Sequence, residues 1–169
     1  MAKLIILEGL SRTGKTTISN NLKNEGIGRI ISLKEKRPED CDVASFYKGI
    51  GLISNEFYKA FPEETFILDR SFLSEFVYSK FFRRPDSTNR EFVEDLLTNN
   101  EVIQFYLHNT YEDYLKRSPK DRYIYTEEDY SKITNLFERK LFEYKTNTLS
   151  IDTSKNDLQQ VYNLIKNHI

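Results

Sequence analysis

Short apolar runs recur along the chain, and between them lie longer stretches in which apolar residues stand three or four positions apart. Short runs of this kind are typical of buried strands, and the wider spacing is typical of amphipathic helices. The runs predict strands at residues 4–7, 29–33, 65–69, 101–107 and 146–151. The longer stretches predict helices at residues 15–25, 43–60, 72–82, 88–97, 111–116, 127–144 and 154–167.

Strands that alternate with helices predict an α/β fold, in which one parallel sheet is covered by helices on both faces as a three-layer sandwich. The chain has 169 residues, which fits a single domain over residues 1–169. Ligands of such sheets bind beyond the carboxyl ends of the strands. Gly9, Asp69 and the segments after Leu33 and Leu107 fall at that edge, so we expect the functional site there.

A glycine-rich stretch, GLSRTGKT at residues 9–16, follows the first predicted strand and precedes the first predicted helix. It matches the phosphate-binding P-loop, whose glycines let backbone N–H groups surround a phosphate at a helix N-terminus. Lys15, in a solvent-open loop, would reach the β- and γ-phosphates of ATP, and the Thr16 hydroxyl would be a ligand of Mg²⁺. We expect ATP to be bound by Gly9, Ser11, Arg12, Thr13, Gly14, Lys15, Thr16 and Thr17.

Asp69 and Arg70 close the third predicted strand beside this loop. An acid there can hold Mg²⁺ with Thr16 or accept a proton from an acceptor hydroxyl, and an arginine can bind phosphate through two hydrogen bonds. Arg12, inside the loop, would contact the transferring phosphoryl group, or alternatively would be solvated. The candidate catalytic residues are therefore Lys15, Arg12, Asp69 and Arg70.

Residues 117–126 form a basic segment between two predicted helices. Arg117 and Arg122 would bind the ATP phosphates from a lid over the site, although a merely solvated basic loop is the alternative. A base needs an aromatic surface to stack on or a slot to enter, although aromatic residues at helical spacing more often belong to the core. The candidates for such a surface are Phe46, Tyr47, Phe57, Tyr58 and Tyr78.

The stretch LEGLSRTGKTT at residues 7–17 resembles the P-loop of thymidylate kinases, including the subgroup with an arginine at the position of Arg12. FILDRSFLS at residues 66–74 resembles the Asp-Arg motif and downstream serine of that family, and also the acid-Arg-Ser motif of deoxynucleoside kinases. Residues 114–117 and 151–154 resemble the start of the family lid and the segment before its closing helix. The resemblance extends to compact bacteriophage members.

This resemblance implies the P-loop kinase fold and a Mg²⁺-dependent transfer of the ATP γ-phosphoryl group. The expected acceptor is a nucleoside monophosphate or deoxynucleoside monophosphate, and a nucleoside or a modified nucleotide within DNA are the alternatives. Thymidylate kinases usually carry an aspartate at the position of Ser11, which binds the sugar 3′-hydroxyl, so we expect serine to discriminate less against a substituted 3′-oxygen. The implied acceptor-binding residues are Glu8, Ser11, Arg37, Phe46, Tyr47, Phe57, Arg70, Ser74 and Tyr78.

The amino-acid composition limits which ligands and binding partners are expected. The 25 Lys and Arg nearly balance the 26 Asp and Glu, which disfavours DNA as the acceptor and favours a small nucleoside or nucleotide. Cys41, the single cysteine, excludes an intrachain disulfide, and with His108 and His168 it cannot form a zinc site. The chain has no long apolar run and begins directly with a strand, so we expect a cytoplasmic protein of a bacterium or infected host, with no membrane partner and a homodimer left open.

Two functions of other classes compete with a kinase. A GTPase switch would read guanine through [NT]-K-x-D, which SKND at residues 154–157 resembles weakly, but residues 69–72 are not D-x-x-G. A nucleotide-binding interaction module would bind phosphate without chemistry. The presence of Lys15 and Thr16 together with Asp69 and Arg70 disfavours that alternative.

Overall fold

The structure is a computed structural model that describes residues 1–32, 41–86, 90–117, 124–144 and 147–169. Its sheet has five strands in the order β2-β3-β1-β4-β5, and every adjacent pair is parallel. The prediction of a parallel α/β sheet is therefore confirmed. The strands are β1 (Lys3–Glu8), β2 (Arg29–Ser32), β3 (Thr65–Asp69), β4 (Glu101–His108) and β5 (Thr148–Asp152).

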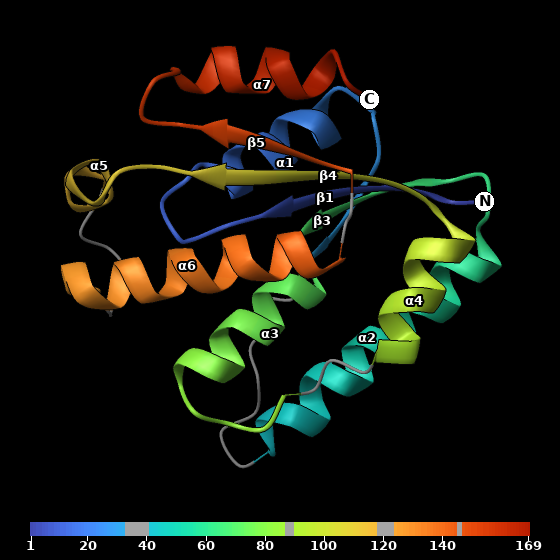
Figure 1. The fold of residues 1–169 in the computed structure, drawn as a ribbon. Helices are drawn as coiled ribbons and strands as arrows, with labels where there is room; N and C mark the ends of the chain where they lie inside the picture. Colours follow the sequence, from blue (N-terminus) through green and yellow to red (C-terminus); the bar gives the residue numbers. More distant parts are fainter. Residues whose placement is uncertain (33–40, 87–89, 118–123, 145–146) are drawn as a thin grey trace.

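Helices cover both faces of the sheet, as Figure 1 shows, with α1 and α7 on one side and α3 and α6 on the other. The alternation along β1 explains the two layers. Ile5 and Leu7 pack with residues of α1 and α7, whereas Leu4 and Ile6 pack with residues of α2, α3, α4 and α6. The helices are α1 (Lys15–Asn24), α2 (Val43–Ala60), α3 (Phe72–Phe81), α4 (Arg90–Asn99), α5 (Tyr111–Lys116), α6 (Glu127–Tyr144) and α7 (Leu158–Lys166).

The carboxyl ends of the central strands meet at one edge of the sheet. Leu7 in β1 is in register with Asp69 in β3, and Glu8 with Tyr106 in β4. The chain leaves β1 through Gly9, whose φ of 128° and position allow only glycine, because a Cβ there would lie 2.0 Å from the carbonyl oxygen of Leu107. This edge is where the P-loop begins.

The last helix begins later than the predicted residue 154, because Asp157 caps it. The Asp157 carboxylate accepts a hydrogen bond from the Gln160 N–H at 2.8 Å, and the Gln160 side chain accepts one from the Asp157 N–H at 2.9 Å. This capping box fixes the first residue of α7 at Leu158. Ser154 instead folds back, and its N–H donates to the Asp152 carboxylate at 3.0 Å.

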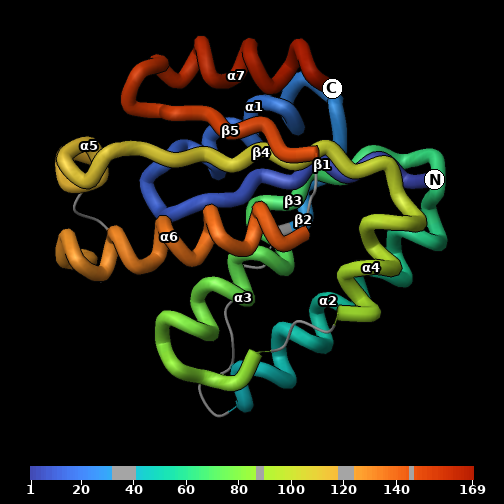
Figure 2. The backbone as a smooth tube through the Cα atoms, in the orientation of Figure 1, coloured from blue at the N-terminus to red at the C-terminus, as the bar shows by residue number. Residues whose placement is uncertain are grey.

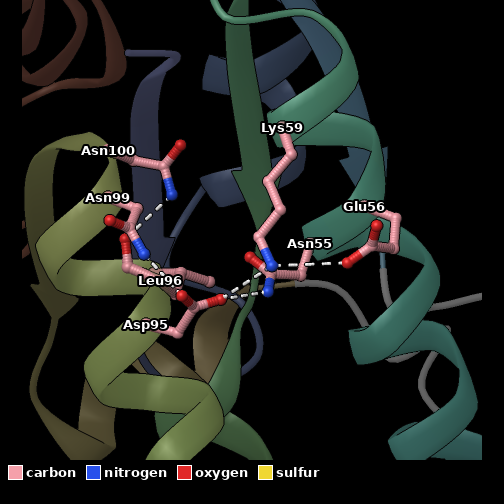
Figure 3. A network of polar contacts seen from close by, with 7 residues as sticks. All are labelled: Asn55, Glu56, Lys59, Asp95, Leu96, Asn99 and Asn100. Carbon is pink, nitrogen blue, oxygen red and sulfur yellow. Dashed lines mark hydrogen bonds and ion pairs between the residues drawn. The ribbon is translucent and has the colours of Figure 1, made fainter.

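Helices α2 and α4 lie side by side, in both the ribbon of Figure 1 and the tube of Figure 2, and form the outer wall below the sheet. A polar network joins them, as Figure 3 shows. The Asp95 carboxylate accepts hydrogen bonds from the Asn55 and Asn99 amides and lies 3.3 Å from the Lys59 ammonium. The hydrogen bond from Asn55, followed by the contacts with Lys59, lowers the pKa of Asp95 in spite of its partial burial.

No helix in the described part of the chain is long and apolar enough to cross a membrane.

Candidate functional site

The P-loop closes on itself between β1 and α1. Gly14 adopts a left-handed conformation with φ 89° immediately before α1 begins at Lys15. The Thr13 hydroxyl donates to the Leu10 carbonyl at 2.9 Å, and the Lys15 ammonium donates to the Thr13 hydroxyl at 2.9 Å and to the same Leu10 carbonyl. Lys15 is only 3% exposed, so the expectation of a solvent-open lysine was wrong. A phosphate would have to replace the Leu10 and Thr13 oxygens around this ammonium.

Thr16 and Asp69 bring α1 and β3 together. The Thr16 hydroxyl donates to the Asp69 carboxylate at 2.7 Å. Asp69 is buried at the end of β3. Mg²⁺ prefers oxygen ligands and is usually held by one or two protein oxygens together with water and substrate phosphates. The pair fits that requirement, whereas the described residues contain no group of three or more Asp, Glu, His or Cys that could enclose a metal ion without help from a substrate.

One side of the P-loop faces a cavity of about 380 Å³ next to α7, which we call the α7 cavity. Arg117, at the end of α5, fixes one wall. Its guanidinium donates to the Arg12 carbonyl at 3.3 Å and to the Thr153 carbonyl at 2.5 Å. The cavity is lined by Arg12, Gly14, Thr17, Arg117, Thr153, Asn156, Asp157, Leu158 and Val161.

Arg12 points toward α5. It has a φ of 66°, its guanidinium lies 4.4 Å from the centre of the Tyr114 ring, and it donates to the Tyr114 carbonyl at 2.9 Å. An arginine over an aromatic face gains a cation–π attraction. The Arg12 side chain therefore extends from the P-loop to α5, the helix from which the predicted lid starts, and its role toward a phosphoryl group stays a prediction.

The other side of the P-loop faces a cavity of about 460 Å³ next to α3, which we call the α3 cavity. It combines aromatic rings, which are common in small-molecule sites, with charged side chains of both signs. Ser11 is the P-loop residue in its wall, and Tyr47 is a residue of α2 in its wall. The cavity is lined by Ser11, Val43, Tyr47, Arg70, Ser74, Glu75, Tyr78, Phe82, Arg84 and Tyr125.

Arg70 is held in the wall of this cavity by its backbone and by its surroundings. It has a φ of 80°, its N–H donates to the Leu7 carbonyl at 3.0 Å, and its guanidinium lies 5.0 Å from the centre of the Tyr78 ring. Burial lowers the pKa of Arg70, but Tyr78, Glu8 and Asp69 together raise it above its ordinary value. The guanidinium is thus a fixed positive charge beside the P-loop.

Glu8 was expected to contact the acceptor, but it is fully buried beneath α3 and does not line the cavity. Its carboxylate accepts hydrogen bonds from the Ser71 N–H at 2.8 Å, the Ser74 N–H at 3.3 Å and the Ser74 hydroxyl. Since the Ser71 side chain makes no capping bond, Glu8 supplies the cap of α3 from β1. Burial raises the pKa of Glu8, although Ser74 and Arg70 favour its charged form.

No known protein-family profile matches the sequence, and no curated protein matches it. Solved structures match almost its full length. The YorR protein from Bacillus subtilis, solved in complex with phosphorylated GDP, has a TM-score of 0.71 and 23% identity over 98% of this chain and 94% of that one. Thymidylate kinase from Candida albicans has a TM-score of 0.65 and 17% identity, covering 99% and 91%. Deoxyadenosine kinase from M. mycoides with bound dATP has a TM-score of 0.64 and 20% identity, and the match covers 98% of this chain and 98% of that one.

This chain has the P-loop kinase fold. The five-stranded parallel sheet and the nearly full-length match to these structures confirm the fold that the sequence motifs indicated.

Several residues that were expected to bind the acceptor do not line the α3 cavity. Phe57 is 47% exposed and packs on Phe61 rather than on a cavity. Phe46 contacts the edge of Tyr47 and is absent from the wall of the α3 cavity, and Tyr58 is buried in the core. Arg37, Arg122 and most of the predicted lid lie outside the described residues.

Sequence reasoning missed part of the α3 cavity. Glu75 and Arg84 line it as an ion pair, and Phe82 and Tyr125 add aromatic surface. One signal was available, because Glu75 is the single acid within residues 72–82, which are otherwise mostly apolar. A charged residue in such a helix is rarely buried unless it is paired.

Proposed function

We propose that this protein transfers the γ-phosphoryl group of ATP, with Mg²⁺, to a nucleoside monophosphate. One observation carries the proposal: the consecutive loop residues Ser11 and Arg12 line different cavities, so the P-loop separates two spaces. A transferase must hold a donor and an acceptor on either side of the group that moves. A GTPase or a binding module needs only one nucleotide site.

The α7 cavity is the donor side in this proposal. Gly14 and Thr17 bring backbone and hydroxyl groups of the P-loop to its wall, and Arg117 adds a positive charge. The Lys15 ammonium would exchange its hydrogen bonds to the Leu10 and Thr13 oxygens for contacts with the β- and γ-phosphates. Thr16 and Asp69 would hold Mg²⁺, which neutralises charge on the phosphates when it is bound.

The α3 cavity is the acceptor side. Arg70 gives it a fixed positive charge next to the P-loop, where a 5′-phosphate of the acceptor would lie. A guanidinium that binds phosphate through two hydrogen bonds favours a monophosphate over an uncharged nucleoside. The neighbours support a nucleotide as ligand, since they were solved with phosphorylated GDP and dATP or are named thymidylate kinase.

The GTPase alternative is disfavoured by the residues after β5. The [NT]-K-x-D resemblance needs a carboxylate at Asp157 that is available to guanine. That carboxylate instead caps α7 through its hydrogen bond with the Gln160 N–H, and Lys155 forms an ion pair with Asp152 at 3.1 Å.

A panel of acceptors tests the proposal. Nucleosides, nucleoside monophosphates and short oligonucleotides are incubated with γ-labelled ATP, with Mg²⁺ or with a chelator. We expect label on monophosphates only, and only with Mg²⁺. Label on nucleosides or oligonucleotides would instead identify a nucleoside kinase or a DNA-directed kinase, and nucleotide binding without any labelled product would identify a binding module.

A further inference from the structure

An ion pair inside the α3 cavity has no role in the mechanism proposed above. The Arg84 guanidinium donates two parallel hydrogen bonds to the Glu75 carboxylate, at 2.5 and 2.7 Å. Both side chains are largely buried, with 19% exposure for Arg84 and 6% for Glu75. Glu75 lies in α3, whereas Arg84 comes from the segment after that helix and folds back over it.

The same guanidinium also lies over an aromatic ring. Its central carbon is 5.5 Å from the centre of the Tyr47 ring, which belongs to α2. Arg84 is thus a flat group that places its N–C–N edge on a carboxylate and its face near an aromatic side chain. A planar base bound in the cavity would make the same two kinds of contact.

We propose, resting on the proposed function, that the α3 cavity selects a guanine base and that Glu75 reads it, exchanging Arg84 for the N1–H and N2–H groups of guanine. Guanine contains the same N–C–N unit as a guanidinium and presents two adjacent donors on one edge. A carboxylate accepts such a pair through both oxygens.

The other common bases do not match this edge. Adenine and cytosine place one amino donor beside a ring nitrogen that accepts. Thymine and uracil place one N–H between two carbonyl oxygens, which a carboxylate repels. A buried carboxylate held by two parallel donors is therefore complementary to guanine alone among them.

The cavity has room for the exchange. Its volume of about 460 Å³ lies within the range of small-molecule sites, whereas the chamber behind it, which shares Tyr47, Arg70 and Glu75 as walls, has about 60 Å³. A purine therefore stays in the α3 cavity, next to Glu75. Before and after the exchange the carboxylate has a two-donor partner and is not left buried and unpaired, and the displaced Arg84 guanidinium, which is already 19% exposed, turns toward solvent.

Binding measurements on the full chain test this inference. Dissociation constants are measured by calorimetry for GMP, dGMP, dAMP, dCMP and dTMP, with Glu75→Gln and Arg84→Ala as variants and Glu94→Gln as the control. Glu94 also pairs with an arginine, Arg90, but on the exposed face of α4. Thermal unfolding of each protein alone shows that it is folded.

We expect GMP and dGMP to bind tightest to the natural protein. Glu75→Gln should weaken them roughly 10- to 100-fold relative to dTMP, because an amide presents a donor where guanine also donates. Arg84→Ala should bind guanine nucleotides as well as or better than the natural protein, and Glu94→Gln should be unchanged.

Equal binding of all bases, equal weakening of all bases by Glu75→Gln, or loss of guanine binding in Arg84→Ala would overturn the inference. If Glu75→Gln does not fold, the base panel and Arg84→Ala still decide. Guanine-selective binding without label transfer would reject the proposed kinase and keep this inference, whereas label transfer without guanine selectivity would do the reverse.

Discussion

The two cavities on either side of the P-loop are built in different ways. Much of the α7 cavity comes from backbone: the Gly14 turn, the capped start of α7 and the Thr153 carbonyl that binds Arg117. The α3 cavity is made by side chains of both charges and by aromatic rings. Backbone groups bind phosphate in any sequence that forms the turn, whereas side chains determine what else can bind. The comparison teaches that the donor half is general and the acceptor half is particular to this chain.

Replacing the P-loop lysine should have the largest effect. Lys15→Ala removes the ammonium that would bind the transferring phosphates, and we expect turnover to fall roughly 100- to 1,000-fold, as when one charge-stabilising group is lost. Steady-state kinetics measure this, and circular dichroism monitors the fold. Lys23→Ala, in the exposed last turn of the same helix, is the matched control. A folded Lys15→Ala protein with most of its activity would contradict the P-loop assignment.

The next largest effect should come from the donor side. Asp69→Asn keeps an oxygen that can accept from Thr16 but removes the charge that would attract Mg²⁺. We expect kcat to fall roughly 100-fold while the KM values change little, because the lost interaction strengthens in the transition state. A magnesium titration of activity should shift to higher concentration. An unchanged titration would show that Asp69 does not hold the metal.

A change on the acceptor side should separate the two halves. Arg70→Ala should raise the KM of a monophosphate acceptor roughly 10- to 100-fold and leave the KM of ATP unchanged, since a charge-assisted pair of hydrogen bonds is lost on one side only. Arg139→Ala, on the exposed side of α6, is the control. If kcat falls instead and the acceptor KM is unchanged, Arg70 acts on the transferred group.

The smallest effect concerns the outer wall next to the acceptor side. Asp95→Ala removes the acceptor of the Asn55 amide between α2 and α4, and we expect the free energy of unfolding to fall by about 1–2 kcal/mol. Because the pKa of Asp95 is lowered in the folded protein, its contribution is present above the unfolded pKa of about 3.9 and is lost as the pH falls through the folded value. Urea denaturation at neutral and acidic pH measures both.

The control for this prediction is Glu94→Ala, which removes an exposed ion pair within α4. Such pairs contribute only about 0.3–0.5 kcal/mol. An equal loss in the two variants would show that the network of Figure 3 does not join the helices.

Much of the donor half could be predicted from the sequence. The strands have local apolar runs, the P-loop is a contiguous motif, and parallel strands end at the same edge, which places Asp69 near Thr16. Start positions were less certain, because the start of α7 depends on which polar residue caps it. Asp157, rather than a residue near Ser154, makes the capping bonds.

The acceptor half could not be predicted in the same way. Arg84 reaches Glu75 from a turn beyond the end of α3 in which Arg83 adopts a φ of 52°, and no periodic pattern encodes such a turn. Tyr125 also lines the cavity, although in the sequence it is separated from α3 by more than 40 residues. Its position depends on a hydrogen bond from its N–H to the Tyr114 hydroxyl at 3.0 Å, which connects residues from two parts of the chain.

The buried carboxylate of Glu8 connects the end of β1 with the start of α3. Glu8 immediately precedes the P-loop in the sequence. Its carboxylate accepts hydrogen bonds from the first turn of α3, a helix that begins shortly after Arg70. The Glu8 side chain, together with the backbone hydrogen bond from the Arg70 N–H to the Leu7 carbonyl, therefore holds that arginine at a fixed distance from the phosphate-binding loop. Transfer between two ligands is sensitive to misplacement of about 1 Å. A side chain that lines neither cavity therefore helps to set the spacing across which a phosphoryl group would move in the proposed reaction.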